Sequence, residues 1–94
     1  MKKIRSVTVS GRRWRLVWKS YLGHDAEGNE FIGRCYLDKK EIHVKNNMSY
    51  ALTSEILIHE MLHAQNPKHT EDDITQDALE LAQALKRAEL LKDE

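Results

Sequence analysis

The feature that most constrains the fold is Tyr50–Gln65, a run that contains neither glycine nor proline. Asn47 or Ser49 can serve as its N-cap, and Pro67 ends the run because proline disfavours helical geometry in the residue before it. These signals predict a helix over about 49–65. Apolar residues lie nearly all round this helix, which implies burial on most sides. They are Ala51, Leu52, Ile56, Leu57, Ile58, Met61, Leu62 and Ala64.

One polar group interrupts this apolar helix, in the segment HEMLH. His59 and His63 are four residues apart, so both imidazoles lie on one helix face and can bind one zinc ion. Glu60 lies one residue further round, where its carboxylate can accept a proton from a zinc-bound water. Burying these groups without partners would be costly, and a metal ion removes that cost. The sequence therefore predicts a Zn2+ site with Glu60 as general base.

A third zinc ligand is expected after His63, and two residues are candidates. His69 fits the spacing, because HEMLHAQNPKH matches the HExxHxxGxxH motif of metzincins with Asn66 in the place of glycine. Glu71 fits the helix pattern, because it lies three residues before Ile74 on the apolar stripe of the next helix. A glutamate from the following helix is the arrangement of gluzincins. The spacing favours His69, and Glu71 stays open as the alternative.

The chain after Pro67 predicts a second helix over about 71–91. Thr70 is a good N-cap, and the acidic residues in the first turn suit the helix dipole. The apolar residues recur at helical spacing, and the short connection predicts that the two helices form a hairpin. The stripe consists of Ile74, Ala78, Leu81, Leu85 and Ala88.

The first half of the chain has the alternation of strands. Trp14, Leu16 and Trp18 alternate with basic residues, which predicts a strand with one buried face. FIGRCYL and EIHVK, joined by the turn DKK, read as a hairpin. We therefore predict an α+β fold: a small antiparallel sheet of three or four strands within about 4–45, followed by the helix hairpin, in a single domain over 1–94.

The layout GRCYLDKKEIHV, then LIHEMLHA, then NPKHTEDDITQDALELAQAL resembles the small zincin-type metallopeptidases of phages and prophages, which are similar to SprT-like and minimal gluzincin proteins. The resemblance covers roughly residues 31–85, and HEMLHA is its most specific part. It implies a minimal zincin-like fold, with His59 and His63 as zinc ligands and Glu60 as base. An acidic helix start after a proline also matches that family and supports Glu71. The implied activity is hydrolysis of a peptide or protein substrate.

Two further residues are candidates for contacts with the substrate or with the oxyanion. His43 lies on the predicted strand EIHVK, which could align an extended peptide by strand addition. Tyr50 begins the predicted active-site helix, and tyrosine is a common oxyanion donor in such sites. Packing is the simpler explanation for each of them.

Charge and composition bear on partners and location. The first twenty residues hold seven basic residues and no acidic one, so nucleic acid is a candidate partner, although a solvated basic face is the simpler interpretation. Cys35 is the single cysteine, and there is no continuous apolar run typical of a signal peptide or a membrane span. We expect a cytoplasmic protein without a membrane partner. The alternatives to a peptidase are a non-enzymatic zinc-binding accessory or regulatory protein and a nucleic-acid-associated SprT-like protease.

Overall fold

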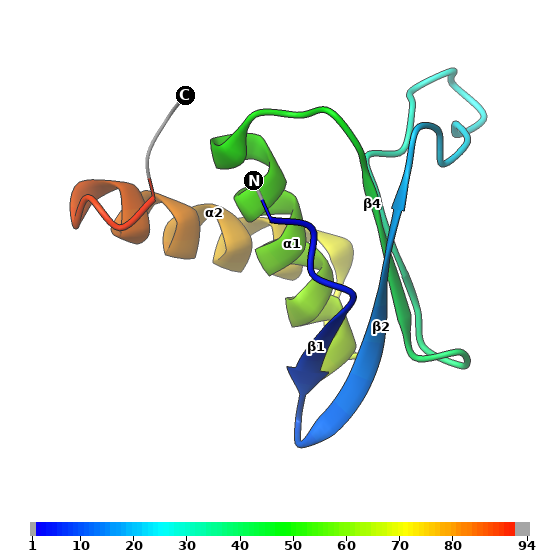
Figure 1. Cartoon of the computed structure of the whole chain (residues 1–94), viewed down its shortest axis with the longest axis horizontal. Coiled ribbons are helices and arrows are strands. Elements are labelled where there is room, and N and C mark those ends of the chain that lie inside the picture. Colours follow the sequence, from blue (N-terminus) through cyan, green and yellow to red (C-terminus); the bar gives the residue numbers. More distant parts are fainter. Residues whose placement is uncertain (1, 92–94) are drawn as a thin grey trace.

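The structure is a computed structural model, and it describes residues 2–91. The predicted α+β class is confirmed: these residues form a four-stranded sheet followed by two helices (Figure 1). The elements are β1 (Ser6–Val9), β2 (Arg12–Lys19), β3 (Gly33–Tyr36), β4 (Glu41–Lys45), α1 (Tyr50–Gln65) and α2 (Glu71–Arg87).

The sheet is mixed, with the strand order β1-β2-β4-β3. The pairs β1–β2 and β3–β4 are antiparallel, as predicted, but β2 and β4 are parallel, so the prediction of a wholly antiparallel sheet is wrong for this pair. The reason is the long connection after β2. This connection leaves the position next to β2 empty and leads to β3 at the edge of the sheet. The chain then turns back, and β4 fills the position between β2 and β3.

One face of the sheet forms the core against α1. Five buried residues supply the sheet side, and Ile56, Leu57 and Met61 of α1 pack on them. The prediction that Trp14 and Leu16 face inward is confirmed, since they are 5% and 4% exposed. Both helices lie on this side of the sheet in Figure 1. The buried set is Val9, Trp14, Leu16, Ile42 and Val44.

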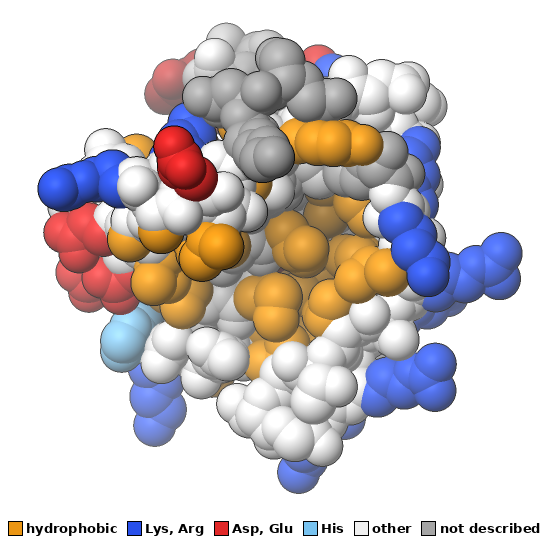
Figure 2. Space-filling view, turned by 60° about the vertical axis from the view of Figure 1, so that its left-hand side comes forward, with side chains coloured by type: hydrophobic (Ala, Val, Ile, Leu, Met, Phe, Trp, Pro, Cys, Tyr) orange, Lys and Arg blue, Asp and Glu red, His pale blue; other side chains and the backbone are white. Residues whose placement is uncertain are grey.

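Helix α1 begins as predicted, with the hydroxyl of Ser49 accepting a hydrogen bond from the N–H of Leu52. The expected burial on most sides is wrong, because only Thr53 and Glu60 of α1 are buried. The sheet covers one side of α1 and α2 covers another, and no further element of residues 2–91 covers the rest. Hydrophobic side chains accordingly remain visible across the middle of the face shown in Figure 2.

Helix α2 begins at Glu71, with the Thr70 hydroxyl accepting a hydrogen bond from the N–H of Asp73. It ends at Arg87, earlier than predicted, and Glu89 follows with a positive φ of 59°. Helix α2 packs on α1 through its buried residues Ile74, Ala78 and Ala82 and contacts no strand. In Figure 1 it crosses α1 instead of running back along it. Neither helix combines the length and apolar character needed to cross a membrane.

Candidate metal centre

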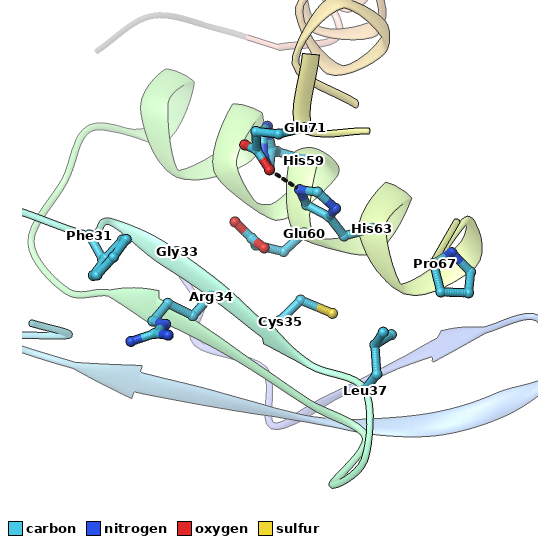
Figure 3. Close-up of a pocket in the computed structure, with 10 residues that line it drawn as sticks. All are labelled: Phe31, Gly33, Arg34, Cys35, Leu37, His59, Glu60, His63, Pro67 and Glu71. Carbon is cyan, nitrogen blue, oxygen red and sulfur yellow. Dashed lines mark hydrogen bonds and ion pairs between the residues drawn. The ribbon is translucent and has the colours of Figure 1, made fainter. Parts of the chain in front are cut away.

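Three potential metal ligands converge where α2 begins beside α1 (Figure 3). The rings of His59 and His63 lie one helical turn apart, with centroids separated by 4.9 Å. One carboxylate oxygen of Glu71 is 2.9 Å from Nε2 of His59, and the other is 2.6 Å from Nε2 of His63. One ligand atom from each residue can be chosen so that all three lie within 4.8 Å of one another.

This group of side chains fits a zinc ion. Two imidazole nitrogens and one carboxylate oxygen are a common ligand set of catalytic zinc, which leaves the fourth position open for water or substrate. The histidine side chains are 17% and 23% exposed, whereas that of Glu71 is 68% exposed. The cluster is therefore anchored on the half-buried face of α1 and remains open to solvent on the side of α2.

Glu60 points away from this cluster, towards the sheet (Figure 3). It is 6% exposed, and among residues 2–91 no side chain forms an ion pair with its carboxylate. Burial raises the pKa of Glu60 to about 7, with a further rise from the charge of Glu71 and an opposing effect of Arg34. A carboxyl group with a pKa near neutrality can both accept and return a proton, which suits a general base.

Gly33 allows strand β3 to approach Glu60. A Cβ atom at position 33 would lie 2.5 Å from Cγ2 of Ile56 and 2.9 Å from Oε2 of Glu60, so a larger residue would require a shift of helix or strand. The sequence reasoning missed this residue. Its signal was available, because a glycine inside a strand often marks a close approach of another element.

A pocket of ≈ 490 Å³ lies between α1 and β3, and the three candidate ligands are among the residues that line it. Cys35 lies on its strand side. Burial, followed by the charge of Glu60, raises the pKa of the Cys35 thiol to about 11. The thiol is therefore protonated near neutral pH. The lining consists of Phe31, Gly33, Arg34, Cys35, Leu37, His59, Glu60, His63, Pro67 and Glu71.

The structure brings Glu71, and not His69, to the histidine pair. His69 is exposed in the connection between the helices, where its N–H donates a hydrogen bond to the carbonyl of Asn66. Thr70, the cap of α2, follows this turn directly. Glu71, the first residue of α2, is therefore the residue that lies beside His59 and His63. The spacing favoured His69, but the structure places the alternative, Glu71, beside the histidine pair. Spacing along the chain could not distinguish a turn residue from a helix start.

His43 does not reach the pocket. Its neighbours Ile42 and Val44 face α1, so His43 faces the opposite side of the sheet. There its Nε2 lies 3.0 Å from Oε1 of Glu41, and its ring packs on Tyr36 with centroids 4.6 Å apart. Strand β4 is also interior, so no substrate strand can pair with it. His43 is therefore not among the predicted site residues that the structure brings to the pocket.

Tyr50 is not among the residues that line the pocket. It is the first residue of α1, nine positions before His59, which corresponds to roughly 13 Å along a helix. Tyr50 is therefore not among the predicted site residues that the structure brings to the candidate ligands.

Comparisons with models of protein families, with curated proteins and with solved structures found no match to this chain. Its chemistry is therefore argued from the site itself. That site combines the histidine pair and Glu71 as a ligand group, Glu60 as a buried acid–base group, and a pocket that opens onto both.

Proposed function

We propose that the protein is a zinc-dependent metallopeptidase. Its ligands are His59, His63 and Glu71, and Glu60 is the general base. The observation that carries the proposal is the convergence of these three ligands, within 4.8 Å, beside a buried carboxyl group in an accessible pocket. When bound, zinc would polarise the substrate carbonyl and make water a better nucleophile near neutral pH.

Glu60 would move the proton in this reaction. Its carboxylate would accept a proton from the attacking water and then pass that proton to the departing amine, so that the peptide bond is cleaved and the carboxylate is regenerated. The pKa of about 7 suits both transfers. Its position on the strand side of α1 directs it towards a substrate lying between helix and strand.

Strand β3 is the element best suited to align such a substrate. It is an edge strand that pairs only with β4, so an extended peptide can add to its outer edge by backbone hydrogen bonds. This edge borders the pocket through Gly33 and Cys35. Strand β3 is thus better suited than the strand of His43 to align an extended peptide.

The test is peptide cleavage by the zinc-loaded protein and its Glu60→Gln variant, assayed with a random-sequence peptide mixture and an unfolded protein. The variant should keep its zinc and lose roughly 100-fold or more of the cleavage rate, because it lacks the proton acceptor. Glu55→Gln, on the same helix but outside the pocket, is the matched control and should retain activity. Equal cleavage by wild type and Glu60→Gln would refute the proposal.

A non-enzymatic zinc-binding protein is the second candidate. The solvent exposure of Glu71 favours it, because no element of residues 2–91 closes over the site from that side. Stoichiometric zinc binding without cleavage of either substrate would support this alternative. The single free cysteine agrees with a reducing compartment, and we propose the cytoplasm for either activity.

A nucleic-acid-associated protease is the third candidate, favoured by a basic hollow away from the metal centre. Arg15 in this hollow has a side chain that is 71% exposed, and Glu41 is its one acidic lining residue. DNA binding that weakens steeply with added salt would support this function, and salt-independent or absent binding would exclude it. The hollow is lined by Arg5, Ser6, Arg13, Arg15, Lys39, Lys40 and Glu41.

A further inference from the structure

The pocket is chemically different at its two ends (Figure 3). Phe31 and Arg34 lie at one end, Leu37 and Pro67 lie at the other, and Glu60 lies between them. Arg34 pairs with His43 across the ladder, so its side chain leaves β3 on the face turned away from α1. A peptide paired with the outer edge of β3 would point every second side chain to that face, where it would meet Arg34.

Arg34 is held in place by aromatic rings. Its guanidinium carbon is 4.6 Å from the centroid of the Phe31 ring and 5.5 Å from that of Tyr36, within the range of cation–π interactions. Phe31 is itself fixed, since its N–H donates a hydrogen bond to the carbonyl of Gly23. The guanidinium is thus oriented by its neighbours before any ligand arrives.

Arg34 has no anionic partner. Among residues 2–91 it is the one lysine or arginine that lines the pocket, and no carboxylate oxygen of these residues lies within 4.0 Å of its guanidinium. Glu30 is already paired with Lys45, and Glu41 with Arg15 and His43. Glu60 feels the charge of Arg34 but forms no ion pair with it. A guanidinium offers a planar fork of donors that matches a carboxylate, and here that fork is unused.

We infer that Arg34 determines specificity by binding a carboxylate of the peptide substrate, on the side of the reacting bond that faces Phe31. This inference rests on the proposed function. The carboxylate comes either from an aspartate or glutamate side chain or from the C-terminus of the peptide, because the same chemistry recognises both.

The first experiment identifies the preferred residues from the cleavage sites of zinc-loaded wild type in a random-sequence peptide mixture. Matched peptides then carry Glu, Gln or Lys at the selected position, each with a free or an amidated C-terminus. The variants are Arg34→Gln, Arg34→Lys and Arg34→Glu. Lys39→Gln is the control, because Lys39 lies 5.4 Å from the same Tyr36 ring but does not line the pocket.

Wild type and Lys39→Gln should cleave the acidic peptide with a kcat/KM roughly tenfold higher than the Gln peptide, as expected for one charge-assisted contact. Arg34→Gln should lose this preference, Arg34→Lys should keep part of it, and Arg34→Glu should favour the Lys peptide. If kcat/KM depends on amidation of the C-terminus and not on the side chain at the selected position, Arg34 binds the C-terminal carboxylate. A preference that survives in Arg34→Gln, or is missing from wild type, would overturn the inference.

A binding measurement separates this inference from the proposed function. The zinc-loaded Glu60→Gln protein, with and without Arg34→Gln, is titrated with the Glu and Gln peptides. If wild type cleaves nothing, the peptidase proposal fails, but tighter binding of the Glu peptide that depends on Arg34 still supports the carboxylate site. Equal binding of both peptides would overturn it.

Discussion

Glu60 and Glu71 are both glutamates beside the histidine pair, but their surroundings give them different chemistry. Glu60 is 6% exposed and faces the strand, so burial raises its pKa to about 7. The side chain of Glu71 is 68% exposed, and both of its oxygens contact imidazoles. The first is thus suited to proton transfer and the second to metal binding, although the residue type is the same.

Gly33 should be the most sensitive position on β3. Gly33→Ala places a methyl group 2.5 Å from Ile56 and 2.9 Å from Glu60, so we expect a loss of about 1–3 kcal/mol in the free energy of unfolding and a lower cleavage rate. Urea unfolding and the peptide assay measure the two effects. Cys35→Ala, which removes volume from the same strand, should leave Glu60 in place. Wild-type stability and activity in Gly33→Ala would contradict the close packing.

The thiol of Cys35 should react slowly in the folded protein. Its pKa is raised from 9.0 to about 11, so at pH 8 the thiolate fraction falls about 100-fold and alkylation by iodoacetamide should slow accordingly. The rate should continue to rise with pH beyond 9, and urea should abolish the protection. Glu60→Gln should speed alkylation in part, because it removes the charge of Glu60, which is the smaller of the two causes of the raised pKa of Cys35. A folded protein that reacts as fast as the unfolded chain would show that Cys35 is not shielded.

At the scale of elements, the start of α2 places Glu71 at the candidate metal centre. Thr70 caps the helix whose first residue is Glu71, and Ser49 caps α1 ten residues before His59. The two caps make equivalent hydrogen bonds of 3.1 Å to the backbone. They differ in that only the Thr70 cap lies next to a candidate ligand.

This difference gives a matched pair of substitutions. Thr70→Ala and Ser49→Ala should each cost about 1 kcal/mol of stability, as expected for a lost N-cap. Thr70→Ala should also weaken zinc binding several-fold, because fraying of the first turn releases Glu71. Ser49→Ala should bind zinc as wild type does. Urea unfolding and zinc titration of both variants check this, and equal zinc affinity in the two would show that the cap does not position the ligand.

The sequence predicted the elements better than their arrangement. Strand alternation, the Ser49 and Thr70 caps and the HEMLH spacing are local, so the helices and the placement of His59, Glu60 and His63 followed from short windows. The parallel pairing of β2 with β4 and the meeting of Glu71 with α1 depend on how distant segments pack. The incomplete burial of α1 also depends on the number of layers around it, which the periodicity of one helix cannot reveal.

At the scale of the whole molecule, α2 is the least anchored element. It packs on α1 alone and touches no strand. A zinc ion bound by two residues of α1 and one of α2 would join the helices, and a ligand that binds only the folded state stabilises it by about 2.7 kcal/mol at a free concentration of 100 Kd.

Zinc should therefore slow amide hydrogen exchange in α2 more than in the strands. Mass spectrometry of the protein with zinc and with a chelator measures this directly. Glu71→Ala should remove the additional protection of α2 but leave the exchange of the sheet unchanged. Protection that rises equally in all elements, or only within α1, would contradict a bridge between the helices.

The central claim is that Glu71 completes the site of His59 and His63. Calorimetric titration of zinc into wild type, Glu71→Ala and His69→Ala tests it most directly, with circular dichroism to confirm that each variant is folded. We predict that Glu71→Ala weakens zinc binding by roughly tenfold or more and that His69→Ala stays within about twofold of wild type. Weakened binding in His69→Ala, with Glu71→Ala unchanged, would contradict the account.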